Sequence, residues 1–323
     1  MNPIQRKIRA AVVGAGYLGK FHAQKYANME NVDLIGVADT DMAAAERVAA
    51  SLDTRAYADY TDLFGRVDAV SVVVPTSAHF EVSKDFLLHN VDLLVEKPFT
   101  TTLQEADELI RISESRGLLV QVGHLERYNP AVVALQDIIK NPLFIESHRL
   151  GIFKPRATDV SVVLDLMIHD IDIILNFVKA EMEGIRAAGM PVITENVDIA
   201  NARLEFKSGC VANVTASRVS MKDERKLRIF QRDAYISIDF ANHEATIVHK
   251  NAGKTDGLIP GMEIETRSFP KGDALDDELK SFVNSVRSRT EPYVTGQMGR
   301  DALKTALDVM SQIRQTRSKL AFL

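Results

Sequence analysis

The stretch Ile8-Arg9-Ala10-Ala11-Val12-Val13-Gly14-Ala15-Gly16-Tyr17-Leu18-Gly19 decides the fold. An apolar run ends in the pattern G-x-G-x-x-G, and a helical pattern over residues 17–29 follows at once. In such a loop the first glycine allows a tight turn, the second lets a diphosphate approach the backbone, and the third lets the helix pack on the strand. The free N–H groups at the start of the helix then face the anion. We therefore predict a dinucleotide-binding Rossmann domain, with five residues of the loop at the cofactor: Gly14, Gly16, Tyr17, Leu18 and Gly19.

A carboxylate at the end of the second apolar run indicates which dinucleotide is bound. This run covers residues 32–38 and ends in Asp39, 20 residues beyond Gly19. A carboxylate at this place accepts hydrogen bonds from both ribose hydroxyls and repels a phosphate on the 2′ oxygen. Thr40 and Asp41 follow, so no arginine is adjacent to receive that phosphate. The sequence favours NAD over NADP.

Composition bounds the class of protein. The chain has 323 residues, 46% of them apolar and 26% charged, which is typical of a globular protein with two domains. A net charge of −5 without a basic tail or patch argues against nucleic acid or a membrane surface as a partner. The single cysteine, Cys210, excludes an intramolecular disulfide framework and fits a reducing compartment. With no signal-peptide pattern and no apolar stretch of membrane-spanning length, we expect a cytoplasmic protein.

The order of predicted helices and strands changes near residue 123. Before it, short apolar runs alternate with helical patterns, which predicts parallel strands in a doubly wound sheet. After it, strand patterns follow one another without helices, which predicts a largely antiparallel sheet. Helical patterns also occur at 160–178, 274–287 and 298–314. We predict an α/β fold with an N-terminal Rossmann domain over 1–122 and a C-terminal α+β domain with a large, mostly antiparallel sheet over 123–323.

Polar side chains follow two further apolar runs of the first domain. Thr76 and His79 come after the run 68–75, and Glu96-Lys97 ends the next predicted strand. Ligands bind outside the carboxyl ends of parallel strands, so we expect all four residues near the cofactor. Thr76 or His79 could instead merely cap a helix, and Lys97 could be a solvated strand end. In the crevice, however, a lysine ammonium would orient a hydroxyl and stabilise charge developing on its oxygen.

A stripe of polar residues lies on the otherwise apolar helical pattern 160–178. At 100° per residue, Asp165, His169, Asp172 and Asn176 share one face. One interpretation is a half-buried helix with one solvated stripe. The other is a cleft wall on which Asp165, one turn away, orients His169 and keeps it basic enough to take a hydroxyl proton. No further ligand cluster accompanies the pair, so we expect no metal.

Three motifs together resemble a known family. The loop G-A-G-Y-L-G, Glu96-Lys97-Pro98, and Asp165-x-x-x-His169 in a second domain are similar to the Gfo/Idh/MocA oxidoreductases, over essentially the whole chain. The resemblance implies that Lys97 and His169 are catalytic, with Asp165 beside them. It also implies that the C-terminal sheet builds a homodimer or homotetramer, and that the lysine–proline bond is often cis.

The segment 123–130, Gly-His-Leu-Glu-Arg-Tyr-Asn-Pro, resembles one branch of that family. This branch acts on nucleotide-activated amino sugars, and the segment resembles that of UDP-N-acetylglucosamine 3-dehydrogenases. The resemblance implies that His124, Arg127 and Tyr128 meet the substrate together with Lys97, Asp165 and His169. Three further basic residues could neutralise a nucleotide diphosphate: Arg149, Lys154 and Arg156.

These observations predict an NAD-dependent dehydrogenase acting on a secondary hydroxyl of a sugar, in particular a UDP-activated amino sugar. His169 takes the hydroxyl proton as hydride passes to nicotinamide, and Lys97 stabilises the oxygen. One alternative is a sensor or scaffold that binds NAD without turnover, although such a protein needs neither Lys97 nor His169. Another is a dehydrogenase of a free sugar or a cyclitol, or a reductase of an imine or a tetrapyrrole. Reduction of an imine or a tetrapyrrole needs no base directed at an alcohol.

Overall fold

The computed structural model describes residues 6–154, 160–251 and 260–320, and the chain forms two compact units. Unit 1 comprises Met1–Leu125 and Asp273–Asp301, and unit 2 comprises Glu126–Gly272 and Ala302–Leu323. In the part of the chain that is described, no helix is both long and apolar enough to cross a membrane.

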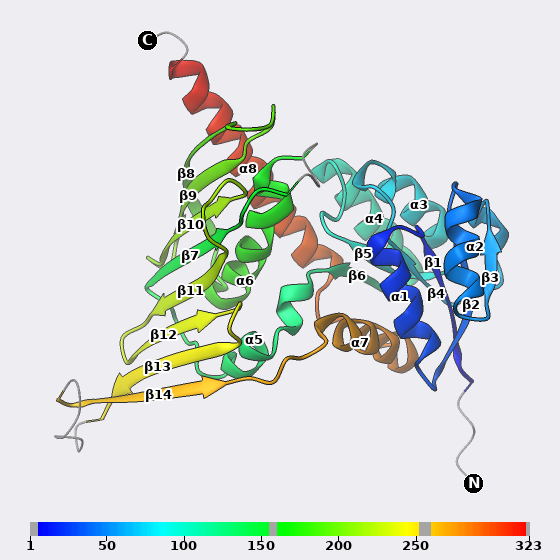
Figure 1. The fold of residues 1–323 in the computed structure, drawn as a ribbon, viewed down its shortest axis with the longest axis horizontal. Helices are drawn as coiled ribbons and strands as arrows, with labels where there is room; N and C mark the ends of the chain where they lie inside the picture. The colour runs from blue at the N-terminus through cyan, green and yellow to red at the C-terminus, as the bar shows by residue number, and fades with distance from the viewer. Residues whose placement is uncertain (1–5, 155–159, 252–259, 321–323) are drawn as a thin grey trace. The chain divides into compact units, whose positions relative to one another are not determined.

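Unit 1 is built on a sheet of six parallel strands in the order β3-β2-β1-β4-β5-β6 (Figure 1). The strands are β1 (Ile8–Val13), β2 (Val32–Ala38), β3 (Arg55–Tyr57), β4 (Ala69–Val72), β5 (Asp92–Glu96) and β6 (Val120–Gly123). The helices are α1 (Tyr17–Ala27), α2 (Met42–Ala50), the 3₁₀ turn η1 (Tyr60–Leu63), α3 (Thr76–Leu88), α4 (Leu103–Arg116) and α7 (Ala274–Ser288). The strand order reverses between β1 and β4, which is where a doubly wound sheet binds its ligand. The predicted Rossmann sheet is confirmed.

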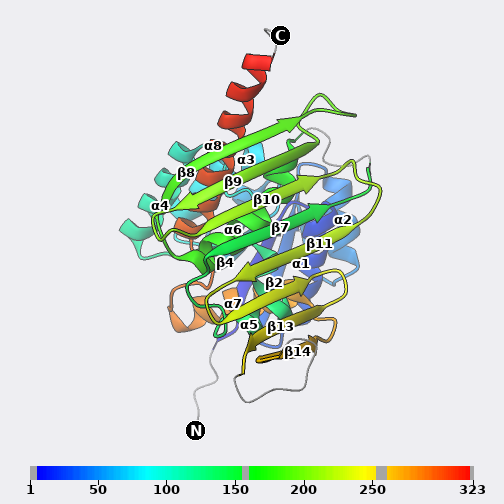
Figure 2. The ribbon, with the colours of Figure 1, turned by 90° about the vertical axis from the view of Figure 1, so that its left-hand side faces the viewer.

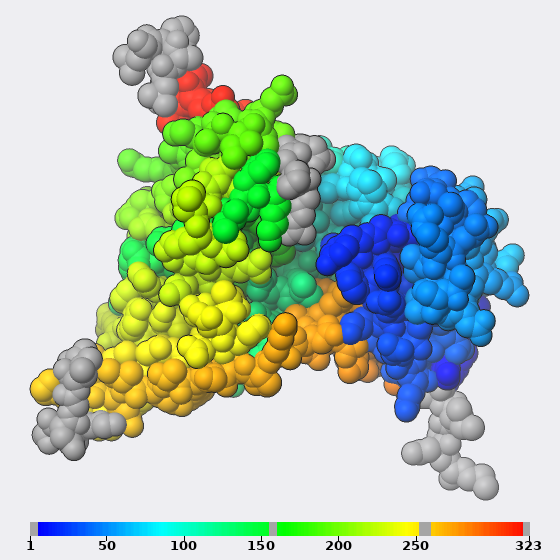
Figure 3. Space-filling model, in the orientation of Figure 1, coloured from blue at the N-terminus to red at the C-terminus, as the bar shows by residue number. Residues whose placement is uncertain are grey.

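The segment 273–301 belongs to unit 1, whereas the sequence placed it in the second domain. On α7, an apolar face with Leu279, Phe282 and Val283 joins the buried core that contains Val12 and Tyr26. Hydrophobic burial therefore returns this segment to the N-terminal sheet across almost the whole length of the chain. In the space-filling view, its orange surface adjoins the blue surface of α1 (Figure 3).

Unit 2 is built on a sheet of eight strands in the order β14-β13-β12-β11-β7-β10-β9-β8. The strands are β7 (Phe144–Leu150), β8 (Met182–Met190), β9 (Ile199–Phe206), β10 (Val211–Ser217), β11 (Glu224–Phe230), β12 (Ala234–Asp239), β13 (Glu244–Lys250) and β14 (Met262–Ser268). Neighbours are antiparallel except β10 and β7. The predicted large, mostly antiparallel sheet is confirmed.

Helices cover one face of this sheet and bury its apolar side chains in a single core. They are the 3₁₀ turn η2 (Leu125–Tyr128), α5 (Pro130–Leu135), the π-helical turn η3 (Val163–Met167), α6 (Ile168–Val178) and α8 (Gly296–Leu320). Figure 2 looks onto the other face, where the strands lie side by side in front of the helices. We call this second face the open sheet face.

The structure departs from the predicted elements at β8 and in the helical segment before α6, among other places. Strand β8 has no strand pattern in its sequence because it contains Gly184 and Gly189 and few β-branched residues; it forms as an edge strand paired with β9. The predicted helix 160–178 is not one regular helix, because a five-residue π-helical turn precedes α6. The wider turn changes the regular spacing that the sequence interpretation assumed.

Candidate functional site

The three glycines between β1 and α1 have different surroundings. Gly14 has a φ of +105°, and a Cβ there would lie 2.4 Å from the carbonyl oxygen of Val73. A Cβ on Gly19 would lie 1.8 Å from the oxygen of Gly14, so this glycine lets the helix approach the loop. A Cβ on Gly16 would meet no atom within 4 Å. Gly16 therefore faces open space, which fits a loop that must admit a diphosphate.

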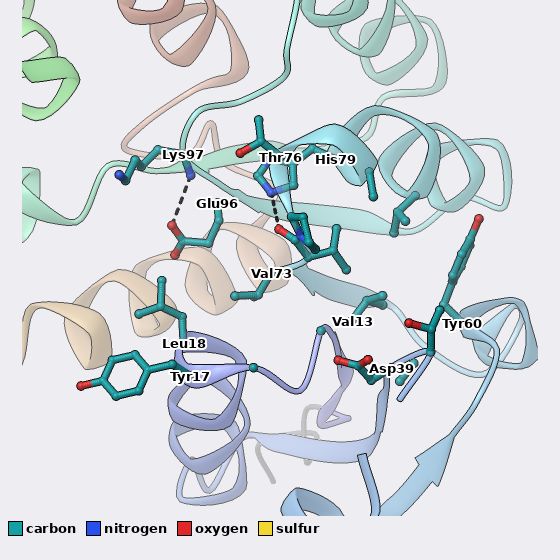
Figure 4. Close-up of a pocket in the computed structure, with 18 of the residues that line it drawn as sticks. Val13, Tyr17, Leu18, Asp39, Tyr60, Val73, Thr76, His79, Glu96 and Lys97 are labelled. Atoms are coloured by element: carbon teal, nitrogen blue, oxygen red, sulfur yellow. Dashed lines mark hydrogen bonds between the residues drawn. The ribbon is translucent and has the colours of Figure 1, made fainter. Parts of the chain in front are cut away.

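This open space is part of a cavity of about 720 Å³ in unit 1. Tyr17 and Leu18, both predicted at the cofactor, line it from the start of α1. Figure 4 shows Glu96 and Lys97 at one end of the cavity and Asp39 toward the other. The cavity thus contains the predicted cofactor residues from the glycine loop, β2 and β5, and it is large enough for a cofactor.

Asp39 is held at the end of β2 by backbone groups on both sides of it. The N–H of Ala15 donates to Oδ2 at 2.6 Å, and the N–H of Asp41 donates to Oδ1 at 2.9 Å. The first of these bonds ties the carboxylate to the glycine loop itself. A carboxylate oxygen has two acceptor positions, so capacity remains for ribose hydroxyls in the cavity.

Thr76 and His79 both line the cavity from α3. The ring of His79 is nevertheless 1% exposed, with Nδ1 2.9 Å from the carbonyl oxygen of Pro98 and Nε2 2.9 Å from that of Val74. Burial lowers the pKa of this imidazole below its ordinary value, although both carbonyls act in the opposite direction. Burial thus favours the uncharged ring, which lies between the ends of β4 and β5 and donates its single hydrogen to one of the two carbonyls. Its predicted contact with the cofactor remains a prediction.

Glu96 and Lys97 stand where β5 ends. The Glu96 carboxylate lies 3.2 Å from Nε2 of the fully buried His22, and it accepts the N–H of Lys97 at 3.2 Å. Burial alone would raise the pKa of Glu96, but the hydrogen bond and charge of His22 and the charge of Lys97 hold that pKa below its usual value. The Lys97–Pro98 peptide bond is cis. Sequence reasoning missed His22, whose only signal is a histidine three residues after Gly19 on the buried side of α1.

In unit 2, Asp165 and His169 lie where two kinds of helix join. Asp165 is in the π-helical turn η3, and its carboxylate lies 3.9 Å from the guanidinium of Arg218. His169 is half-buried in the first turn of α6. Single π-helical turns of this kind are frequent at functional sites. The two residues keep their four-residue separation on one continuous helical segment.

Other predicted residues of unit 2 have structural partners. Arg127 is 2% exposed and binds Asp172 in a bidentate ion pair, at 2.6 and 3.0 Å. The guanidinium is thus buried and held by α6, and the predicted contact of Arg127 with the substrate stays a prediction. Arg149 is likewise buried, between Asp170 and Glu126.

The remaining predicted substrate residues are placed as follows. His124 is 1% exposed and Tyr128 is 7% exposed, at the end of β6 and in η2. Lys154 lines a small cavity of unit 2 beyond β7. Arg156 lies outside the described residues.

Comparisons with known proteins agree with this architecture. Residues 8–124 match the family model described as "Oxidoreductase family, NAD-binding Rossmann fold", and residues 146–237 match the "GFO/IDH/MocA C-terminal domain". The UDP-N-acetylglucosamine 3-dehydrogenase of Acidithiobacillus ferrooxidans is 41% identical over 303 residues, covering 94% of this chain and 96% of that protein. A solved structure of that enzyme superposes with a TM-score of 0.91 at 40% identity, over 95% of this chain and 97% of the other.

More distant relatives share the same plan. The scyllo-inositol 2-dehydrogenase (NAD(+)) of Bacillus subtilis is 27% identical over 312 residues, covering 90% of each chain. A levoglucosan dehydrogenase in complex with NADH has the same fold, with a TM-score of 0.86 over 96% of this chain and 98% of that chain, at 15% identity. The chain therefore belongs to the Gfo/Idh/MocA family of oxidoreductases, and its N-terminal part is the NAD-binding Rossmann domain of that family.

Proposed function

We propose that this protein is an NAD-dependent dehydrogenase of a UDP-activated amino sugar, and that UDP-N-acetylglucosamine, oxidised at a secondary hydroxyl, is its substrate. The observation that carries the proposal is the 41% identity, over 94% of the chain, to a UDP-N-acetylglucosamine 3-dehydrogenase. The presence of Lys97 at the end of the cofactor cavity supports it, as does the Asp165/His169 pair on one helical segment.

In the proposed reaction, each side chain has a distinct task. NAD, when bound, accepts the hydride. His169 takes the proton of the hydroxyl, and Asp165 orients the imidazole. The Lys97 ammonium stabilises the negative charge on the oxygen. Asp39 selects NAD, because a carboxylate held by two backbone N–H groups repels a 2′-phosphate.

The test is direct. Purified protein is incubated with NAD and UDP-N-acetylglucosamine, and the absorbance band of reduced nicotinamide is followed. We expect the band to grow, and we expect His169→Ala and Lys97→Ala to abolish most of that growth. Lys84→Ala is the control, because Lys84 pairs with Glu108 on the surface of unit 1. Near wild-type turnover by either active-site variant would refute the assigned roles.

One second candidate is favoured by a specific observation. The 27% identical scyllo-inositol 2-dehydrogenase matches 90% of the chain, so free inositols belong in the same assay. Turnover of an inositol but of no UDP-sugar would replace the proposed substrate. Binding of NAD without turnover of any sugar or polyol would instead indicate a sensor.

We also propose that copies of the chain associate through the open sheet face, as a homodimer or homotetramer. Directly paired residues of six neighbouring strands form an apolar row across this face: Val211, Phe144, Phe230, Tyr235, Val248 and Ile264. The rings of Phe144 and Phe230 are 5.7 Å apart, and those of Phe230 and Tyr235 are 4.8 Å apart. A continuous apolar row of this kind supports a homodimer or homotetramer. Light scattering should show an oligomer that Phe230→Glu dissociates; a monomeric wild type would refute it.

The proposed location is the cytoplasm. Cys210 is a buried free thiol. A structural thiol of this kind is compatible with a reducing compartment, where disulfides do not persist. Fractionation of the native cells would test this.

A further inference from the structure

Two buried histidines flank the segment Glu96–Pro98. His22 reaches it from α1 and His79 from α3, and their exposed fractions are 0% and 1%. Each ring binds a group directly next to Lys97: His22 binds the side chain of the preceding residue, and His79 binds the carbonyl of the following one. Figure 4 shows His79 on one side of this segment and Glu96 turned back toward the Lys97 backbone.

The contact through His22 fixes the N–H of Lys97. Nε2 of His22 lies 3.2 Å from Oε1 of Glu96, and Oε2 of Glu96 accepts the Lys97 N–H at 3.2 Å. Gly123, on the neighbouring strand β6, closes the other side, since a Cβ there would lie 3.0 Å from the carboxyl carbon of Glu96. The carboxylate is therefore held between an imidazole ring and a strand that has no side chain at this point.

The contact through His79 fixes the other side of Lys97. Nδ1 of His79 lies 2.9 Å from the carbonyl oxygen of Pro98, and Nε2 lies 2.9 Å from that of Val74, just after β4. Both oxygens are acceptors only, and an uncharged imidazole carries one hydrogen. The Pro98 carbonyl belongs to the residue that follows Lys97, so only a hydrogen bond to this carbonyl holds the backbone beside Lys97. Our proposal therefore places the hydrogen on Nδ1.

We propose that His22 and His79 are positioning residues, which hold the backbone on both sides of Lys97 and so direct its ammonium at the reacting oxygen. The inference rests on the role of Lys97 in the proposed function. A lysine side chain is flexible, and its reach is determined by the direction in which it leaves the backbone. Because a misplacement of about 1 Å costs a rate of the order of 100-fold, loss of either contact acts on kcat.

Substitutions that keep one donor of His79 test which contact matters. His79→Asn keeps a donor near the position of Nδ1, and His79→Gln keeps one near Nε2. We expect His79→Asn to retain kcat within about threefold and His79→Gln to lose about 10- to 100-fold, with the KM for NAD nearly unchanged in both. The reverse order, or equal losses in both variants, would overturn the contact through Pro98.

The contact through His22 is tested by coupling to Lys97. His22→Leu should lower kcat about 10- to 100-fold in the wild type but less than about twofold when Lys97→Met is already present. His22→Gln, which keeps a donor near Nε2, should restore most of kcat. His89→Leu is the control, because His89 is an exposed histidine of the same unit and should leave kcat unchanged.

Gly123→Ala provides a second approach if His22→Leu does not fold. It presses on the Glu96 carboxylate, whose atoms are the nearest to the added Cβ, and the resulting loss of kcat should vanish in the same way on the Lys97→Met background. If Lys97→Met lowers kcat, but His22→Leu or Gly123→Ala lowers it by the same further factor on that background as in the wild type, this inference fails and the proposed function stands. If Lys97→Met leaves kcat unchanged on a UDP-sugar, the assigned role of Lys97 fails and this inference fails with it.

Discussion

Alanine at each of the three glycines of the β1–α1 loop should separate the needs of the fold from those of the cofactor. Gly14 has a φ of +105° and stands against the Val73 carbonyl, whereas Gly19 stands against the Gly14 carbonyl. Gly16 has a φ of −69° and open space where a Cβ would be. The protein alone therefore requires glycine at positions 14 and 19, and the requirement at position 16 comes from the ligand.

The magnitudes follow from these surroundings. Gly14→Ala combines a strained backbone, about 1–3 kcal/mol, with overpacking of about 1–3 kcal/mol, so we expect a loss of about 2–6 kcal/mol in the free energy of unfolding. Gly19→Ala places a Cβ 1.8 Å from a backbone oxygen, so the loop must move, and the loss should be comparable. Gly16→Ala adopts its φ without strain, so stability should be unchanged or rise by about 0.4–1 kcal/mol.

The effect on NAD should be greatest where the effect on the fold is least. A methyl group on Gly16 stands between the diphosphate and the backbone, and we expect the Kd of NAD to rise more than about tenfold, or about 1.4 kcal/mol. Urea unfolding without cofactor measures the first quantity, and calorimetric titration with NAD measures the second. Gly16→Ala protein that binds NAD like the wild type, or that is destabilised by more than about 1 kcal/mol without it, would refute the reasoning.

Three further predictions concern unit 2 and its core. Asp172→Ala removes the carboxylate that forms a bidentate ion pair with the buried Arg127 and should cost about 3–5 kcal/mol in urea unfolding, while replacing both residues by apolar ones should recover most of this loss. Burial acts to raise the pKa of Asp198, but hydrogen bonds from the loop at 192–194 lower this pKa to about 2. The ionised carboxylate therefore adds about 2 kcal/mol to the free energy of unfolding above pH 5, and this contribution is lost as the pH falls toward 2. Asp198→Asn should flatten that part of the pH–stability curve. Burial raises the pKa of Cys210 to about 11, so its thiol should resist alkylation at pH 8 until the protein is unfolded; rapid labelling of native protein would contradict this.

Local patterns were sufficient for much of the fold and part of the site. The helix α4 begins at a capping box of Thr102 and Glu105, whose spacing is visible in the sequence, and ends before Gly117, at a φ of +63°. Asn129 caps α5 as the Asn-Pro pair predicts. These signals lie within a few residues of one another, so no distant partner is needed to interpret them.

Distant partners decided the rest. The sequence does not reveal the buried carboxylate partners of Arg127 and Arg149, because a basic residue has the same local pattern whether it meets a ligand or a buried carboxylate. Asp172 lies 45 positions from Arg127, and only packing brings them together. For the same reason the return of α7 to the first sheet could not be read from its amphipathic pattern, which predicts a helix but not the sheet that it covers.

Residues 8–19 and the sheet edge beside them show the same difference between local patterns and distant contacts. Short-range patterns suffice to predict a strand, a glycine turn and a helix over residues 8–19. They also place Asp39, Glu96 and Lys97 at one sheet edge, because parallel strands bring their carboxyl ends together. Packing of α1 and α3 on the sheet is what brings His22 to Glu96, 74 positions away, and places the His79 ring between the carbonyls that follow β4 and β5. Side-chain contacts between packed elements depend on the rotation and depth of each helix on its sheet, and no short-range pattern encodes those quantities.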